Sequence, residues 1–144
     1  MATLNPYLNF DGNTEEAFNF YKSVFGGEFL SVNRFRNVPG LEHIPEEEKD
    51  KIMHIALPIG KGNVLMATDT LKSFGHKLEK GNNISLSLFP ESEQETETLF
   101  KALSEGGTVD QPLEKAVWGA YFGMVTDKFG IRWMLNYDYN QKNA

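Results

Sequence analysis

The stretch that decides the fold is WGAYFGMVTDKFGIRWML, which runs from Trp118 to Leu135. Its centre, Asp127 to Gly130, has the composition of a tight turn between two strands. After the turn, Ile131 to Asn136 alternates apolar side chains with a mixed set. This alternation is expected of a strand that packs on a core with one face only. The stretch therefore predicts a hairpin that closes a sheet.

The same order of signals occurs twice along the chain. Turn residues Asp11 to Thr14 precede an amphipathic pattern that ends at Gly26-Gly27, and Asn13 or Thr14 is expected to cap this helix. Ser92 precedes a second helix, expected over Glu93 to Ser104, which ends before Gly106-Gly107. Alternating segments predict strands over residues 4–10, 28–36, 51–59, 64–69, 83–89 and 108–111, with a loop over 112–115.

Strand, helix and three strands thus occur twice, which predicts an α+β fold of two βαβββ modules. One helix cannot cover both faces of a four-stranded sheet, so we expect a mixed sheet curled around a cleft where a ligand could bind. The chain is expected to be a single domain over residues 1–144. Module one covers about 1–70, module two about 82–137, and a polar tail covers 138–144.

Composition excludes several classes of function. The net charge is -6 and the basic residues are scattered, which argues against nucleic acid as a partner. The absence of cysteine removes disulfides, thiolate metal sites and a cysteine nucleophile. No apolar run approaches the roughly 20 residues needed to span a membrane, and the N-terminus lacks signal-peptide features. We therefore expect a soluble, cytoplasmic protein.

Strand alternation predicts which side chains face the cleft. If Leu8, Phe10, Leu65, Ala67, Ile84, Leu86, Trp133 and Leu135 face the helices, their neighbours face the cleft. With His54 from another strand, the candidate ligand-binding residues are Asn5, Tyr7, Asn9, His54, Met66, Thr68, Asn83, Ser85, Arg132, Met134 and Asn136. Such a surface suits a small organic ligand. The alternative is that this face of the sheet is only solvated, or is buried in a dimer.

The motifs resemble those of PhnB-like proteins of the vicinal-oxygen-chelate superfamily, which includes glyoxalase I, extradiol dioxygenases and bleomycin resistance proteins. The resemblance rests on Leu8-Asn9-Phe10, on Glu16-Ala17 with Phe25-Gly26-Gly27, and on the spacing of Trp118, Gly123, Asp127, Gly130 and Trp133. It covers nearly the whole chain and implies paired βαβββ modules, often in a homodimer. The label of ubiquinone-pathway methyltransferase that this branch often carries has no support here. The only G-x-G, Gly60-Lys61-Gly62, lies in a hairpin rather than between strand and helix.

The superfamily's chemistry depends on a divalent metal, and the resemblance places its four ligand positions at Asn5, Met66, Asn83 and Met134. Amides bind hard divalent ions weakly as lone side chains, and thioethers prefer softer metals. We therefore predict no glyoxalase-type metal site and no cofactor. His54 is expected to be a structural or pocket residue, whereas His43 and His76 are expected to be exposed in loops.

Three functions stay open at this point. The first is metal-free binding of a small organic ligand, as in the drug-binding members of the superfamily. The second is a metal-dependent enzyme of isomerase, lyase or dioxygenase type with non-standard ligands. The third is an interaction protein whose cleft is sealed by a partner chain.

Overall fold

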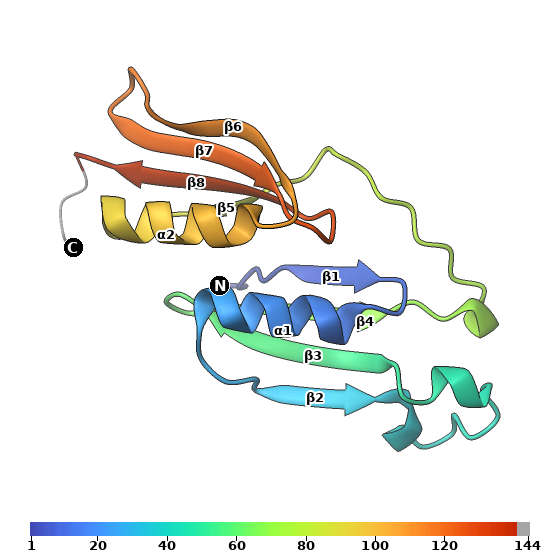
Figure 1. Ribbon diagram of the computed structural model, residues 1–144. Coiled ribbons are helices and arrows are strands. Elements are labelled where there is room, and N and C mark those ends of the chain that lie inside the picture. The colour runs from blue at the N-terminus through green and yellow to red at the C-terminus, as the bar shows by residue number, and fades with distance from the viewer. Residues whose placement is uncertain (141–144) are drawn as a thin grey trace. The chain divides into compact units, whose positions relative to one another are not determined.

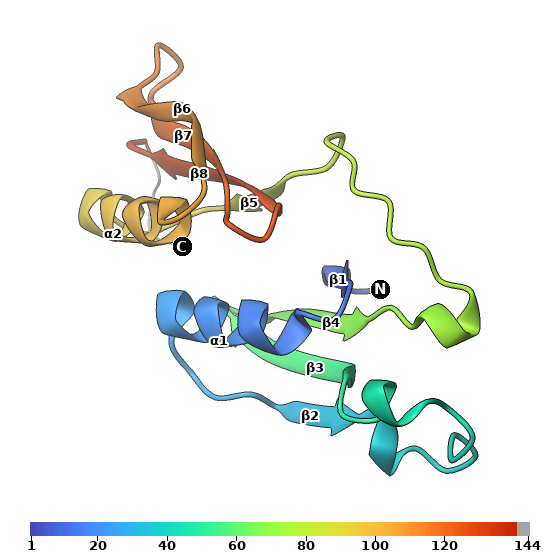
Figure 2. The same cartoon turned by 45° about the vertical axis from the view of Figure 1, so that its right-hand side comes forward.

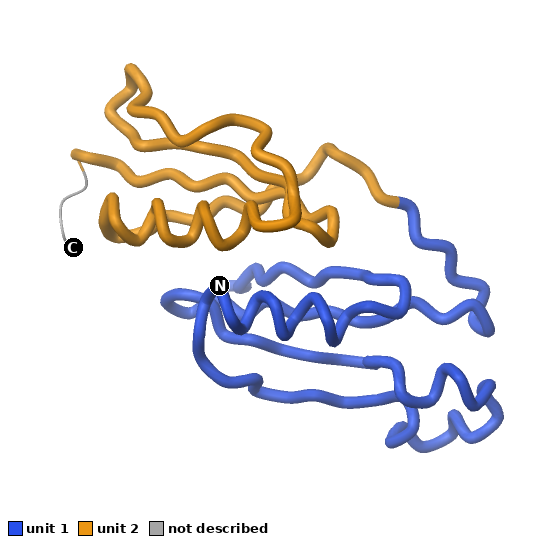
Figure 3. Tube along the Cα trace, in the orientation of Figure 1, with its two compact units in different colours: residues 1–79 blue, residues 80–144 orange. Residues whose placement is uncertain are grey.

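The chain forms two units with the same order of strands and helix. The computed structural model describes residues 1–140; unit 1 comprises residues 1–79, and unit 2 begins at Lys80 (Figure 3). Each unit contains one α-helix and one four-stranded sheet (Figure 1). The expected α+β class, with two βαβββ arrangements, is confirmed.

Unit 1 is a mixed sheet with one helix on its face. Its elements are β1 (Tyr7–Phe10), α1 (Thr14–Phe25), β2 (Ser31–Arg34), β3 (Ile52–Ile59) and β4 (Asn63–Asp69), with 3₁₀ turns at Phe35–Asn37, Glu46–Glu48 and Lys72–Phe74. The strands lie in the order β1-β4-β3-β2, with β1 parallel to β4 and the other pairs antiparallel. α1 lies along one face of this sheet (Figures 1 and 2). The opposite face is termed the open face.

Unit 2 repeats this plan. Its elements are β5 (Leu86–Leu88), α2 (Glu93–Ser104), β6 (Thr108–Lys115), β7 (Ala120–Thr126) and β8 (Arg132–Asp138). The strands lie in the order β5-β8-β7-β6, with β5 parallel to β8. α2 contacts β6, β7 and β8, so the face away from α2 is again an open face.

α1 is capped by a distant carboxylate. The expected cap at Asn13 or Thr14 is wrong, because Asn13 makes no capping bond and the hydroxyl of Thr14 donates to Asp69 Oδ1 at 2.7 Å. The same oxygen accepts the backbone N–H groups of Thr14 and Gly12 at 3.1 and 3.0 Å. Asp69 at the end of β4 therefore satisfies the free donors at the start of α1.

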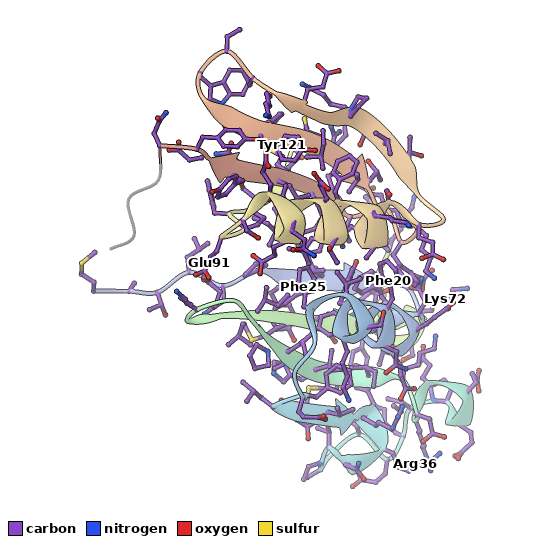
Figure 4. The ribbon with its side chains drawn as sticks, turned by 60° about the vertical axis from the view of Figure 1, so that its left-hand side comes forward. Phe20, Phe25, Arg36, Lys72, Glu91 and Tyr121 are labelled. Carbon is purple, nitrogen blue, oxygen red and sulfur yellow. The ribbon has the colours of Figure 1, made fainter. Side chains whose placement is uncertain are left out.

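α2 starts as its sequence predicts. The side chain of Ser92 accepts a hydrogen bond from the backbone N–H of Glu95 at 3.0 Å, and the helix covers Glu93–Ser104. On the neighbouring strand, Tyr121 extends from β7 and its hydroxyl donates to Glu97 of α2 at 3.2 Å (Figure 4). Tyr121 thus lies on the helix side of the sheet, and the next residue, Phe122, faces the open side.

The helix-facing side chains form the two cores. Phe10, Leu65 and Ala67 are at most 2% exposed in unit 1, and the Phe10 ring packs edge-on against Phe18 of α1 at 6.5 Å. Trp133 of unit 2 is likewise 2% exposed. Strand alternation therefore predicted the buried faces of β1, β4 and β8 correctly.

Four strands differ clearly from expectation, and one of them is β2, which covers Ser31–Arg34 rather than residues 28–36. β1 begins at Tyr7 rather than Leu4, and β5 covers only Leu86–Leu88, so Ile84 lies outside the ladder and is 74% exposed. Residues 112–115, expected to form a loop, belong to β6, where the pairing register shifts on both sides of Gln111. Pro112 has no N–H to give to a ladder, which explains why an irregular strand resembled a loop in sequence.

The hairpin of β7 and β8 is held by a buried carboxylate. Asp127 is 3% exposed; its Oδ1 accepts the backbone N–H groups of Phe129 and Ile131 at 2.8 and 3.0 Å. Its Oδ2 accepts the indole N–H of Trp133 at 2.8 Å. The expected turn over Asp127 to Gly130 is confirmed, and its aspartate ties the turn to the core.

The end of the chain departs in part from the expected tail. Asp138, placed in the polar tail over 138–144, is the last residue of β8. Residues 141–144 of that tail lie outside the described residues. Within the described part of the chain, no helix has the length and apolar character required to cross a membrane.

Candidate functional site

The open face of unit 1 gathers five of the predicted cleft residues. Tyr7 and Asn9 project from β1 and pair with Met66 and Thr68 of β4 in the parallel ladder. His54 lies on β3, opposite Asn33 of β2. The three strands therefore place two aromatic side chains, a thioether, an amide and a hydroxyl on one surface.

Tyr7 and His54 form a pair on this face. The Tyr7 hydroxyl lies 3.2 Å from Nδ1 of His54, and the ring centroids are 5.8 Å apart. Burial raises the pKa of Tyr7, and a hydrogen bond with Thr68 partly opposes that rise. The phenol therefore keeps its proton at neutral pH and can donate it to a hydrogen bond.

A pocket of about 500 Å³ opens at one end of this face. Its apolar lining consists of Phe35, Met53, Phe74 and Leu78. Its polar lining consists of Asn9, Thr68, Asp69, Thr70, His76, Lys77 and Glu79. All these residues belong to unit 1, so the pocket is formed within a single unit.

The segment from Leu71 to Glu79, termed the strap, supplies much of the pocket wall. Leu71 is fully buried and packs with Phe35 and Ile44 in a small cluster. Its backbone N–H donates to Nδ1 of His76 at 3.0 Å, while the N–H of His76 donates back to the carbonyl of Leu71. These bonds close residues 71–76 of the strap into a turn that contains the 3₁₀ residues Lys72–Phe74; Lys72 is labelled in Figure 4.

Glu48 fastens the strap to the rest of unit 1. Its carboxylate accepts hydrogen bonds from the hydroxyl and the backbone N–H of Ser73. The Ser73 hydroxyl lowers the pKa of Glu48, so the bond is strongest when the carboxylate is ionised. Sequence analysis did not single out Glu48. Near it, Arg36, which is labelled in Figure 4, forms exposed ion pairs with Glu46 and Asp50.

Asp69 lies beneath the pocket but is fully engaged. It accepts the three hydrogen bonds that cap α1, and its Oδ2 accepts the backbone N–H of Ile52 at 2.8 Å. A carboxylate held by four donors is a structural group, and its neighbours Thr68 and Thr70 are further polar residues of the pocket lining.

The open face of unit 2 contains the remaining β8 candidates. Arg132, Met134 and Asn136 alternate along the strand with the buried core residues. Met134 pairs with Ser87 of β5 and with Met124 of β7. Neither partner was among the predicted cleft residues, although Ser87 falls on the same face as Asn83 and Ser85 in the expected alternation.

Asn83 and Ser85 precede β5, so strand alternation does not place them on either face. Asn5 precedes β1, and its side-chain oxygen accepts the backbone N–H of Val64 at 2.9 Å. Asn5 therefore ties the chain to the start of β4. His43 and His76 are exposed, as expected, but His76 also lines the pocket.

The residues at the four metal positions do not fit a divalent ion. They are two amides and two thioethers, and the oxygen of Asn5 is already engaged with Val64. Among residues 1–140, no group of three or more histidine, aspartate or glutamate side chains is placed to hold a metal ion. No metal-dependent step is therefore derived for this chain.

Two βαβββ units, each with a helix on one face and an open face opposite, define a protein of the glyoxalase/bleomycin resistance fold. A solved glyoxylase/bleomycin resistance protein/dioxygenase domain from Frankia sp. EAN1pec is similar, with a TM-score of 0.68 and 10% identity. The match covers 99% of this chain and 96% of that chain. At this identity the similarity supports the fold alone.

The chain belongs to the PhnB-like family. The family model that matches it, over residues 2–136, is described as 3-demethylubiquinone-9 3-methyltransferase. A solved structure described as a putative 3-demethylubiquinone-9 3-methyltransferase, PhnB protein, from Bacillus cereus is 29% identical with a TM-score of 0.74. That match covers 94% of this chain and 99% of that chain.

Two further relatives cover nearly the full length. Protein YjdN of Escherichia coli K12 is 31% identical over 137 residues, which is 92% of this chain and 93% of that protein. The crystal structure of PA1353 from Pseudomonas aeruginosa is 40% identical with a TM-score of 0.83, covering 96% of this chain and 98% of that one. Neither description states a ligand or a reaction.

The methyltransferase description is not carried over to this chain. Sites that bind nucleotide-type cofactors between a strand and a helix use a glycine-rich turn and the free N–H groups of the helix. The turn from β1 to α1 contains one glycine, Gly12, and the carboxylate of Asp69 already accepts its N–H and that of Thr14.

Proposed function

We propose that the chain binds a small organic ligand in the pocket of unit 1, without a metal of the glyoxalase type. The observation that carries the proposal is the pocket itself, whose volume of about 500 Å³ lies within the range of ligand sites. Its mixed lining combines an apolar wall with a few polar groups, which is the usual composition of sites for small organic molecules.

The polar groups of the pocket orient the proposed ligand. Within the described residues, no hydrogen bond engages the Asn9 side chain, so its amide offers one donor pair and one acceptor to a ligand. The hydroxyl of Thr68 makes long contacts of 3.3 and 3.4 Å to backbone carbonyls, besides its hydrogen bond with Tyr7. Lys77 and Glu79 carry opposite charges, so the lining favours a neutral ligand over a strongly charged one.

The apolar groups supply most of the binding free energy. Phe35 is 6% exposed and anchored by Leu71 and Ile44, so its ring is a fixed surface. Phe74 packs edge-on against Phe35 at 6.5 Å and is still 43% exposed. A flat apolar ligand that covers Phe74 would remove this surface from water at about 25 cal/mol per Å².

Ligand screening with metal-free protein tests the proposal. Neutral aromatic amides and phenols are added to chelator-treated protein, and binding is followed by amide resonances of residues 68–78. Hits are expected to bind about tenfold more weakly to Phe74→Ala, because the exposed ring is part of the wall. Asn19→Ala on the exposed side of α1 is the matched control and should bind normally.

Two outcomes would count against the proposal. One is binding that appears only after a divalent metal is added, which would favour the metal-dependent enzyme with ligands outside the four family positions. In that case purified protein should contain stoichiometric metal, and His54→Ala should lose it. The other is a set of hits whose affinity is the same in the Phe74 variant and in the control.

A further inference from the structure

Arg132 at the start of β8 has an unsatisfied guanidinium edge. Its Nη1 donates to the backbone carbonyl of Asn82 at 3.0 Å. Its Nε is buried and has no hydrogen-bond partner. Within residues 1–140 no carboxylate forms an ion pair with it. A guanidinium stays charged in proteins, so Nε is a buried donor of a cationic group and has no acceptor.

The free edge has the geometry of a carboxylate site. In a guanidinium, the Nε–H and one Nη2–H point in parallel. Together they form a side-on fork that donates one hydrogen bond to each oxygen of a carboxylate. The bond to Asn82 uses Nη1 and leaves that fork intact. The nearest polar neighbour across the ladder, Thr126, does not fill the fork, because its hydroxyl donates to Asp110 at 2.6 Å.

The surface beside the fork is apolar and ends in a second unsatisfied atom. Met134 follows Arg132 on the open face, with Met124 beside it on β7. Beyond Met134, Oδ1 of Asn136 is buried and also lacks a hydrogen-bond partner. Four residues separate the two orphaned groups, a span of about 13 Å between Cα atoms along a strand.

We propose that the open face of unit 2 is a site for a small organic acid. The carboxylate binds the Nε and Nη2 edge of Arg132, an apolar chain lies over Met134, and a hydroxyl or N–H group donates to Asn136. We choose a carboxylate monoanion rather than a phosphate dianion, because the chain already carries a net charge of -6. This site is distinct from the unit 1 pocket and does not depend on its ligand.

The test uses 8-hydroxyoctanoate, octanoate and octanamide as probes on the full chain. Calorimetry measures affinity, and the Nε–Hε resonance of Arg132 reports contact with the fork. We expect 8-hydroxyoctanoate to bind and to shift that resonance, and octanamide to bind about tenfold or more weakly, because it lacks the charged pair. Octanoate should lie between them, and Asn136→Leu should abolish its difference from 8-hydroxyoctanoate.

Variants distinguish binding by the guanidinium fork from a general effect of positive charge. Arg132→Gln and Arg132→Lys should both lose affinity for 8-hydroxyoctanoate, since lysine keeps the charge but has no side-on fork. Lys101→Gln, an exposed change of charge on α2, should bind as the unmodified chain does. Equal affinity for octanamide and octanoate would overturn the proposal. So would unchanged affinity in folded Arg132→Lys, binding of inorganic phosphate but no carboxylate, or no binding at the solubility limit of the probes.

Discussion

Asp69 and Asp127 are buried acids that serve the fold rather than chemistry. Asp69 ends β4 and Asp127 follows β7, and in both residues each carboxylate oxygen accepts a hydrogen bond from a nearby donor. Burial of a carboxylate is tolerated only when donors replace the lost water, and both sites meet that condition. Asp69 thereby ties the end of β4 to the starts of α1 and β3, and Asp127 ties the end of β7 to its turn and to β8.

Replacement of Asp69 by asparagine tests this role. An amide has one oxygen, so its NH₂ group must face either the Ile52 N–H or the donors of Gly12 and Thr14. We expect Asp69→Asn to lower the free energy of unfolding by about 2 kcal/mol, measured by urea titration. The exposed neighbour Asp11→Asn is the control, and an equally small loss in both variants would contradict the structural role.

At the residue scale, the sequence predicted only part of the candidate site. Strand alternation predicted that Tyr7, Asn9, Met66 and Thr68 share one face of the sheet, and the β1–β4 ladder agrees, because that pattern is local. The pocket wall formed by the strap was not predicted, since its shape depends on the contact of Ser73 with Glu48, 25 residues away. The cap on α1 was missed for the same reason, because Asp69 lies 55 residues after Thr14.

At the scale of elements, the connection from α2 to β6 lies very close to the end of β7 in unit 2. Gly107 follows the end of α2, and a Cβ added to it would lie 2.2 Å from the carbonyl oxygen of Thr126 and 2.9 Å from the carbonyl carbon of Asp127. Backbone atoms cannot move aside as a flexible side chain can. The Gly-Gly signal in the sequence therefore marks a close packing of backbones as well as a helix end.

Substitution of Gly107 by alanine tests this close approach. We expect Gly107→Ala to destabilise the chain by about 1–3 kcal/mol, because the added methyl group forces a shift of the β7 turn. The thermal unfolding midpoint measures the loss. Gly81→Ala is the matched control, since its Cβ would meet only the Asn83 side chain at 3.4 Å. Similar midpoints for the two variants would refute the packing argument.

At the scale of the whole molecule, the repeated turn and helix-end residues were the most informative signal in the sequence. Helix ends at Gly26-Gly27 and Gly106-Gly107 and the turn at Asp127 are all local features, so they predicted the two βαβββ units. The irregular β6 was not predicted, because a proline within a strand reads as a loop when the neighbouring strand is unknown. The short β5 was not predicted either, because the sequence does not show which residues before Leu86 lack a partner strand.

The chain also exposes large apolar side chains. Leu30, Ile84, Phe89 and Trp118 are 63–74% exposed. The family resemblance implies a homodimer, and an interface between chains could cover some of these side chains, so we predict a homodimer. Sedimentation velocity should give twice the mass of 16.3 kDa, and Trp118→Glu should shift the equilibrium toward the monomer while Glu114→Gln leaves it unchanged. A monomer at every accessible concentration would refute this prediction.

The irregularity of β6 has a consequence for aggregation. A sheet that ends in a long, regular strand offers unpaired N–H and C=O groups on which another chain can grow a cross-β stack. Here β6 contains Pro112 and two register shifts, and β2 is four residues long with one shift. The other edges, β1 and β5, have only four and three residues. Both units can thus leave one face of the sheet without a helix and still present no template for fibre growth at their edges.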